Sequence, residues 1–175
     1  MSRLSYEDSC RQLQGKYLDL GAVPPMPERM PRPDDDGTSG VRFFRTFVGG
    51  GEDMSNLTMS RSFFGRSEIS QVAFRGTDFT ESYLCWNDFV DVDFTDAVLA
   101  KSDLRSSDFT RVKFVNADLT SSDLRRSSFS GCDFSGARLD GSTLTHKQGE
   151  KLTLSASQRS RINWVGEDGS EPSGG

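Results

Sequence analysis

Residues 102–121, SDLRS SDFTR VKFVN ADLTS, place a large apolar residue at the third position of every block of five. From Phe64 to Leu144 every fifth residue is Phe, Leu or Ile, without a polar exception. Two residues before each of these centres lies Ser, Ala, Val, Thr or Cys, and Asn87 is the one departure. Two of the five positions are therefore closed to bulky or charged groups.

A spacing of five fits neither the helical period of about 3.6 nor the strand period of about 2. It fits a chain that turns a corner once per block, with the centre pointing inward and the residue two places earlier in the corner. The centres also repeat as Leu, Phe, Phe, Leu, three times at a spacing of twenty from Leu84 to Leu139. Four blocks therefore complete a turn, and the sequence predicts an all-β, four-sided β-solenoid with a close-packed core.

The blocks resemble those of the pentapeptide repeat family, whose consensus is A(D/N)LXX, with good matches at residues 102–104, 117–119 and 122–124. The resemblance implies a right-handed quadrilateral β-helix, and because members are often dimeric, it suggests a homodimer through a capped end. The best-understood members resemble duplex DNA in shape and charge and protect type II topoisomerases from inhibitors. Fold and function are separable, so the resemblance predicts the fold but not the role.

The regular repeat divides the chain into segments. We expect an N-terminal helix and Pro-rich arm (1–40), an N-terminal cap strand (41–51), the β-solenoid (52–145), a C-terminal helical cap (146–165) and a flexible tail (166–175). Residues 52–145 should form about four to five coils, since each coil takes twenty residues. Both ends of such a stack expose core and need caps.

Local signals support the caps. The stretch VRFFRTFV at residues 41–48 is strongly β-prone and precedes a Gly triplet. Ser5 with Asp8 predicts a short helix over about residues 6–14. Two capping boxes begin at Thr145 and Ser155, and each has Gln three residues later. They predict two short helices that close the C-terminal end.

Composition limits the class of partner. The formal charge of −5 argues against direct nucleic-acid binding by neutralisation of phosphates. Three cysteines without CxxC spacing are typical of reduced thiols, so a cytoplasmic location is expected. The first residues contain no apolar signal segment, and no run of about 18 apolar residues could span a membrane.

The exposed charges differ between the four faces. The face that carries Leu84 has a balance of +2, whereas the other three have −3, −1 and −2. On this Leu84 face two aromatic residues stand at outward positions that are usually polar, and aromatics beside Arg are typical anchors of protein interfaces. The predicted partner-binding residues are Tyr83, Trp86, Arg66, Arg105, Arg125 and Arg126. Alternatively, the N-terminal arm lies across the two aromatics, and the solvent exposure of Trp86 separates these accounts.

No arrangement for catalysis, cofactor binding or metal binding emerges. The recurrent Asp before each centre follows a positional rule, so we expect these carboxylates to accept backbone N–H bonds in turns. His146 is the only histidine and lies where the repeat ends. Gly49–Gly51 lacks the Lys-Ser/Thr of a phosphate loop. We therefore expect a protein that is not an enzyme and that needs no cofactor.

Two functional hypotheses remain. The first is a rigid scaffold that binds a protein partner of unknown identity through the Leu84 face or the capped ends. The second is a DNA mimic that occupies the DNA groove of a type II topoisomerase such as DNA gyrase. The first is preferred, because the fifteen acids of residues 52–145 are offset by ten bases and a duplex mimic needs dense negative charge.

Overall fold

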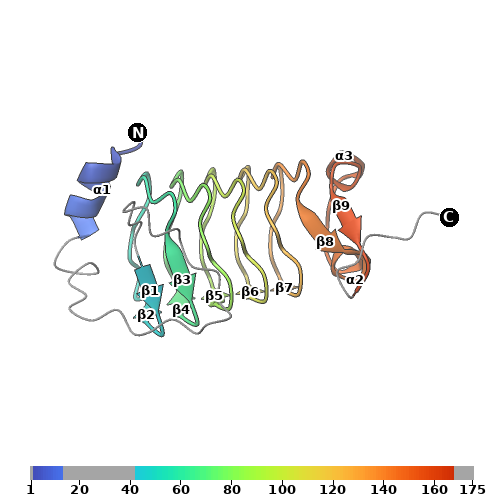
Figure 1. The fold of residues 1–175 in the computed structure, drawn as a ribbon, viewed down its shortest axis with the longest axis horizontal. Coiled ribbons are helices and arrows are strands. Elements are labelled where there is room, and N and C mark those ends of the chain that lie inside the picture. Colours follow the sequence, from blue (N-terminus) through green and yellow to red (C-terminus); the bar gives the residue numbers. More distant parts are fainter. Residues whose placement is uncertain (1, 14–41, 168–175) are drawn as a thin grey trace.

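The structure is a computed structural model that describes residues 2–13 and 42–167. Figure 1 shows a parallel-strand β-solenoid of about six turns with helices at both ends. The predicted β-solenoid is therefore confirmed. The predicted Pro-rich arm and all but the first two residues of the predicted flexible tail lie outside the described residues.

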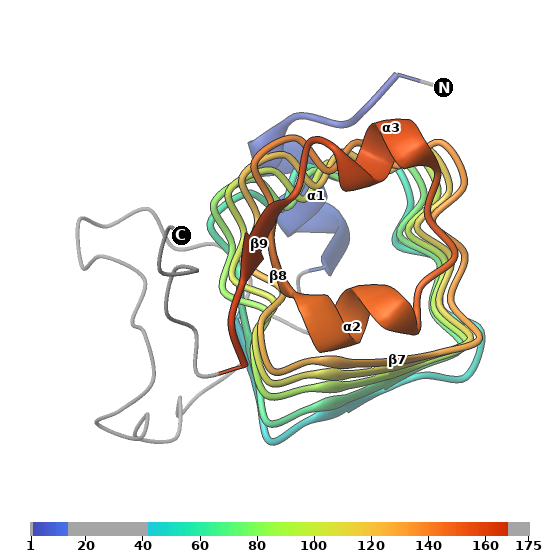
Figure 2. The same ribbon diagram turned by 90° about the vertical axis from the view of Figure 1, so that its right-hand side faces the viewer.

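Successive coils pair in parallel with a shift of twenty residues, so Phe89 pairs with Phe109 and Phe109 with Phe129. On the Leu84 face, the Leu104 N–H donates to the Asp123 carbonyl at 2.8 Å. One turn therefore takes twenty residues, as predicted, and Figure 2 shows the four sides in projection. The principal sheet has the order β2-β4-β5-β6-β7, from β2 (Phe47–Val48), β4 (Glu68–Ser70), β5 (Asp88–Val90), β6 (Asp108–Thr110) and β7 (Ser128–Ser130).

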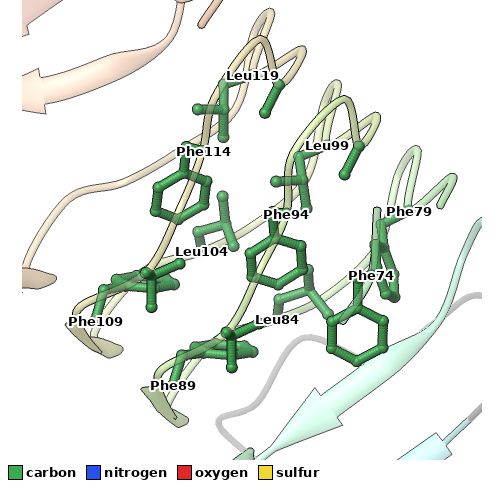
Figure 3. Packing of buried hydrophobic residues seen from close by; sticks show 14 of the residues in the cluster. Phe74, Phe79, Leu84, Phe89, Phe94, Leu99, Leu104, Phe109, Phe114 and Leu119 are labelled. Atoms are coloured by element: carbon green, nitrogen blue, oxygen red, sulfur yellow. The ribbon is translucent and has the colours of Figure 1, made fainter. Parts of the chain in front are cut away.

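The core consists of ladders of apolar side chains, most of them alike, such as Phe74, Phe94 and Phe114, although Phe79 lies in line with Leu99 and Leu119 (Figure 3). The rings of Phe89 and Phe109 stack with centroids 5.0 Å apart and an interplanar angle of 1°. In the next ladder Phe94 and Phe114 stack at 5.5 Å and 10°. Such ring pairs contribute about 0.5–1.5 kcal/mol beyond the area that they bury. Centre residues that are twenty positions apart in the sequence thus contact each other in adjacent coils.

The small residue two places before each centre also links neighbouring coils. Ser107 is buried, accepts from the Asn87 N–H at 3.1 Å and donates to the Leu84 carbonyl at 3.0 Å. Asn87 does the same one coil earlier, since its Oδ1 accepts from the Ser67 N–H and its Nδ2 donates to the Phe64 carbonyl. The one departure from the small-residue rule therefore keeps the same hydrogen bonds.

The fifth residue of most blocks has a left-handed backbone conformation. Fifteen non-glycine residues among those described have φ between 50° and 62°. This conformation is unfavourable by roughly 1–2 kcal/mol for an L-residue. The turn is nevertheless held because the same residue donates its N–H to the following coil, as Asp96 does to the Val115 carbonyl at 2.9 Å.

The N-terminal end differs from the predicted single cap strand. Residues 42–48 form β1 (Arg42–Phe44) and β2, which pair with β3 (Phe63–Gly65) and β4 at a shift of 21 residues. Asp53 bridges Ala73 at a shift of twenty, so the Gly break contains one extra residue. Residues 42–61 therefore form a complete first coil, which is one reason why the solenoid exceeds the expected four to five coils.

Helix α1 (Tyr6–Leu13) lies at the end of this first coil (Figure 1). The Ser9 hydroxyl accepts from the Thr58 N–H at 2.8 Å, and Leu13 is buried in the core. Leu4 donates its N–H to the Asn56 carbonyl. The helix therefore covers apolar residues that the first coil would otherwise expose.

At the other end β8 (Thr143–Thr145) pairs with β9 (Asn163–Val165), and α2 (His146–Glu150) and α3 (Ala156–Arg159) lie between them in sequence. Both predicted capping boxes are confirmed. Gln148 Nε2 also donates to the carbonyls of Leu124 and Ser127 in the coil below. Gln158 makes the equivalent pair of bonds to Phe134 and Ala137. Each cap helix thus satisfies carbonyl groups that no further coil could reach.

Candidate interaction surface

The two aromatic residues of the Leu84 face are not equivalent. Tyr83 is half-buried against Phe63 and Cys85, which are both buried. Trp86 is 52% exposed and has a φ of 62°. Burial, with a smaller contribution from the Asp103 carboxylate, raises the pKa of the Cys85 thiol to about 12. Tyr83 therefore contributes to packing, whereas Trp86 projects from the surface.

Two of the four predicted arginines pair with carboxylates of their own face. Arg105 donates to Asp103 through Nε at 2.9 Å and Nη2 at 2.6 Å, and its Nε lies 3.7 Å from Asp123. Arg125 pairs with Asp123 in the same way. The hydrogen bonds to Asp103 raise the pKa of Arg105 above its ordinary value. These four charges largely neutralise one another.

The other two arginines remain free of such contacts. In the part of the chain that the structure describes, neither Arg66 nor Arg126 makes an ion pair. Arg66, Trp86, Ser106 and Arg126 occupy the same left-handed corner position in four successive coils. We call Arg66, Trp86 and Arg126 the Trp86 strip. It presents an exposed aromatic ring between two free cations.

A column of carboxylates lies on the adjacent face, two residues further along the chain from the strip. Glu68, Asp88 and Asp108 are outward residues of β4, β5 and β6, and they pair in register. All three are exposed, and none of them has an ion-pair partner within residues 2–13 and 42–167. We call these residues the acidic column. The charge polarity that the sequence predicted thus changes sign across one corner.

Six of the recurrent Asp residues before a centre accept a backbone N–H, as predicted, whereas Asp88 and Asp108 of the acidic column accept none from the described residues. Asp118 accepts from the Thr120 N–H at 3.0 Å and Asp133 from the Ser135 N–H at 2.9 Å. Asp93 is partly buried, which by itself would raise its pKa, but hydrogen bonds from Thr95 and Arg75 outweigh burial and lower it. The described residues contain no group of three or more His, Cys, Asp and Glu arranged to hold a metal ion.

Three other observations bear on function. His146 is the first residue of α2 and stacks on Trp164 at 5.6 Å. In the described ranges no helix has both the length and the apolar character needed to cross a bilayer. Phe47 is 62% exposed at the N-terminal end of the acidic column. Sequence reasoning did not identify Phe47 as a surface residue, although it precedes the centre Val48 just as Asp precedes other centres.

Comparison with known proteins gives a family match and a set of similar solved structures. A family described as pentapeptide repeats matches residues 88–126 and 107–145, with 8 copies. HetL, a pentapeptide repeat protein involved in heterocyst differentiation regulation in Nostoc sp. strain PCC 7120, is 13% identical over 59% of each chain, with a TM-score of 0.43. The chain thus spans about three fifths of HetL.

Two further solved structures are similar to this chain. A pentapeptide repeat protein from the Arabidopsis thaliana thylakoid lumen is 27% identical over 65% of this chain and 72% of that one, with a TM-score of 0.34. QnrB1, a plasmid-mediated fluoroquinolone resistance protein, is 14% identical over 59% of this chain and 67% of its own, with a TM-score of 0.45. No curated protein matches the sequence.

Proposed function

We propose that the protein, whose residues 88–145 match the pentapeptide repeat family, is a rigid, non-catalytic scaffold that binds a protein partner through the Trp86 strip. The observation that carries this proposal is the placement of Trp86. Trp86 is 52% exposed on a left-handed corner between two cations that lack ion-pair partners among the described residues. The three free cysteines of the described chain agree with the cytoplasmic location that we also propose.

Folding alone does not account for a tryptophan at this corner. A left-handed conformation is unusual for a bulky residue, and such conformations cluster where function requires them. The other non-glycine corner residues are Arg, Asn, Gln, Glu, Asp, Lys and Ser. Exposed aromatic residues flanked by Arg are enriched among the residues that contribute most to protein binding. Partner binding therefore explains the presence of Trp86 at this exposed corner, which packing within the solenoid does not.

The solenoid also holds the strip in a fixed geometry. Corner residues of successive coils are separated by about 4.8 Å, the spacing of paired strands. The residues that follow these corners, Ser67, Asn87, Ser107 and Ser127, are buried and hydrogen-bonded from coil to coil, so the partner meets a surface that needs little ordering. Binding to a preorganised surface loses less conformational entropy.

The test is a quantitative pull-down from the source cells with wild type and three variants. Trp86→Asn removes the ring but keeps a residue that tolerates the left-handed conformation. Arg66→Glu reverses one free charge of the strip, and Lys101→Glu reverses a charge at an equivalent left-handed corner on another face. The same partner should be lost with Trp86→Asn and Arg66→Glu and retained with Lys101→Glu. Full retention by both strip variants would disprove the site.

The acidic column supports a second candidate, in which the protein mimics DNA and binds a type II topoisomerase. Its three carboxylates are exposed, aligned along the axis and without ion-pair partners in the described structure. A gyrase supercoiling assay, with and without a quinolone, tests this candidate. Inhibition or protection that is lost in a Glu68→Gln, Asp88→Asn double variant would support it. If micromolar protein has neither effect, this candidate is excluded.

A further inference from the structure

A cavity of about 270 Å³ lies between β7 and the cap helix α2, away from Trp86. Figure 2 shows α2 on the side of the coil that carries β7. The cavity is lined by Arg126, Ser127, Ser128, Phe129, Thr145, Lys147, Gln148, Lys151 and Glu167. It combines an aromatic ring with three cationic side chains and a single carboxylate.

The aromatic ring is accessible because the Phe ladder ends here. Phe129 stacks on Phe109 at 5.2 Å on one side, but it is only partly buried. Twenty residues later the chain has Gly149, which offers no side chain to cover the ring. A Cβ at Gly149 would lie 2.5 Å from the Trp164 ring, so the close packing of α2 excludes a larger residue. One face of Phe129 therefore remains available to a ligand.

The charges around this ring favour an anion. Arg126, Lys147 and Lys151 are exposed, and none of them has an ion-pair partner among the described residues. Among the described residues of the lining, Glu167 is the only acidic one, and its Oε1 accepts from the Lys147 N–H at 3.2 Å. The cavity thus already holds one carboxylate of the chain itself, and two of its three positive charges remain unbalanced.

We propose that this cavity binds a carboxylate joined to a flat apolar group, presented by a small acid or by the C-terminal residue of a peptide. The apolar group stacks on Phe129, and the carboxylate lies among Arg126, Lys147 and Lys151. Glu167 competes with the ligand for this positive region. The site goes beyond the proposed scaffold function, with which it shares only Arg126.

The experiment is an NMR titration of the ¹⁵N-labelled full chain, followed at the amides of Ser128, Phe129 and Lys147. One arm uses benzoate and the other acetyl-Ala-Ala-Phe with a free carboxylate; the controls are benzamide and the C-terminal amide of the same peptide. Saturable shifts at these amides with a carboxylate, and much weaker binding of its amide, support the site. The tighter arm identifies the source. Shifts that do not saturate, or equal binding of the amides, overturn the proposal.

Variants separate a defined site from a general effect of charge. Lys151→Gln should weaken binding by about two- to fivefold, the upper part of the range for one exposed charge pair. Glu167→Gln should strengthen it by a similar factor, because the competing carboxylate is removed. Glu150→Gln removes the same charge from an exposed position of α2 that does not line the cavity, and should leave affinity unchanged. If Glu150→Gln and Glu167→Gln strengthen binding equally, the proposal fails.

One variant separates this site from the proposed scaffold surface. Trp86→Asn should leave carboxylate binding unchanged while it removes partner binding. If the partner still binds this variant, the scaffold surface is wrong and the cavity is unaffected. If Trp86→Asn weakens carboxylate binding at the Phe129 amide, the cavity is not an independent site and the proposal is overturned.

Discussion

At the scale of single residues, each position of a block has its own physical task. The centre packs in the core, the small residue two places earlier bridges coils, and an Asp before the centre accepts a backbone N–H in most blocks that have one. The last position combines a left-handed backbone with exposure to solvent. At this last position the backbone conformation, rather than the packing of the side chain, limits which residues are tolerated.

Ser121 tests this last position. It has a φ of 58°, is exposed, and its N–H donates to the Asp140 carbonyl. We expect Ser121→Val to be less stable than Ser121→Gly by about 1–2 kcal/mol, the free energy of the left-handed conformation for a residue with a Cβ. Urea denaturation of the two variants measures the difference. Equal stability would mean that the corner relaxes without strain.

Asp93 should make stability depend on pH. Burial opposes its ionisation, but the bonds from Thr95 and Arg75 lower its folded pKa. A carboxyl with a lowered folded pKa stabilises the protein above its unfolded pKa of about 3.9, and this stabilisation is lost as pH falls through the folded value. Thermal unfolding of Asp93→Asn should therefore vary less with pH below about 4 than that of wild type.

Asp96→Asn is the matched control for this pH effect. It lies in the same block and is exposed, and its carboxylate accepts no hydrogen bond from the described residues. The pH dependence of its unfolding should equal that of wild type. If both variants flatten the profile equally, the specific bonds of Asp93 are not its cause.

At the scale of elements, the solenoid depends on caps that satisfy the final carbonyl groups. The glutamines of the two capping boxes do this, and each also accepts the N–H of its own N-cap residue, Thr145 or Ser155. The boxes are visible in the sequence, and so the helices were predictable. The hydrogen bonds from these glutamines to the preceding coil were not predictable, because they depend on which carbonyl groups of that coil lie next to each helix.

Replacement of one such glutamine should loosen its cap. Gln148→Ala leaves the Ser127 carbonyl without its partner, whereas the Leu124 carbonyl keeps the Ser127 N–H at 3.3 Å, and an unsatisfied buried group is unfavourable by about 1–3 kcal/mol. Hydrogen exchange of the Leu152 amide, which bonds to Gly149, should accelerate accordingly. Glu150→Ala, at an exposed position of the same helix, should change it little. Comparable acceleration in both would show that helix propensity, rather than these bonds, holds the cap.

At the scale of the whole molecule, each coil is stabilised mainly by the coils above and below it. Phe109 stacks between Phe89 and Phe129 and is fully buried, whereas Phe129 stacks on Phe109 alone and is partly buried. The same substitution should therefore have different effects in the middle and at the end of the stack.

Phe109→Ala should lower the free energy of unfolding by about 3–5 kcal/mol, the range for a buried Phe. Phe129→Ala should lower it clearly less, since it removes one stacking contact and a ring that is partly solvated. Equilibrium denaturation of both variants measures the two values. Equal losses would mean that ring burial, and not the number of stacked neighbours, determines stability.

The sequence predicted the register of the coils because the centre residues identify themselves by size at a constant spacing. It did not predict the first coil, because the extra residue before Asp53 shifts Phe43 and Val48 out of that spacing. The charge balance of the Leu84 face was also predictable. The sequence did not distinguish the arginines that form ion pairs from those that form none among the described residues, although a signal was present. Arg105 lies on the outward side of the same block as Asp103, whereas Arg66 lies at the left-handed corner of a block without an Asp.

The extra residue in Gly49–Gly51 has a consequence for how this chain can change in length. The corner accommodates it while the pairing beyond Asp53 keeps its normal offset, so a local insertion has been confined to a single bend. No atom of residues 2–13 or 42–167 lies within 4 Å of where a Cβ would project at Gly50 or Gly51. This bend is therefore a natural place to graft a longer loop, and a solenoid of this kind could acquire new binding segments there without any alteration of its core.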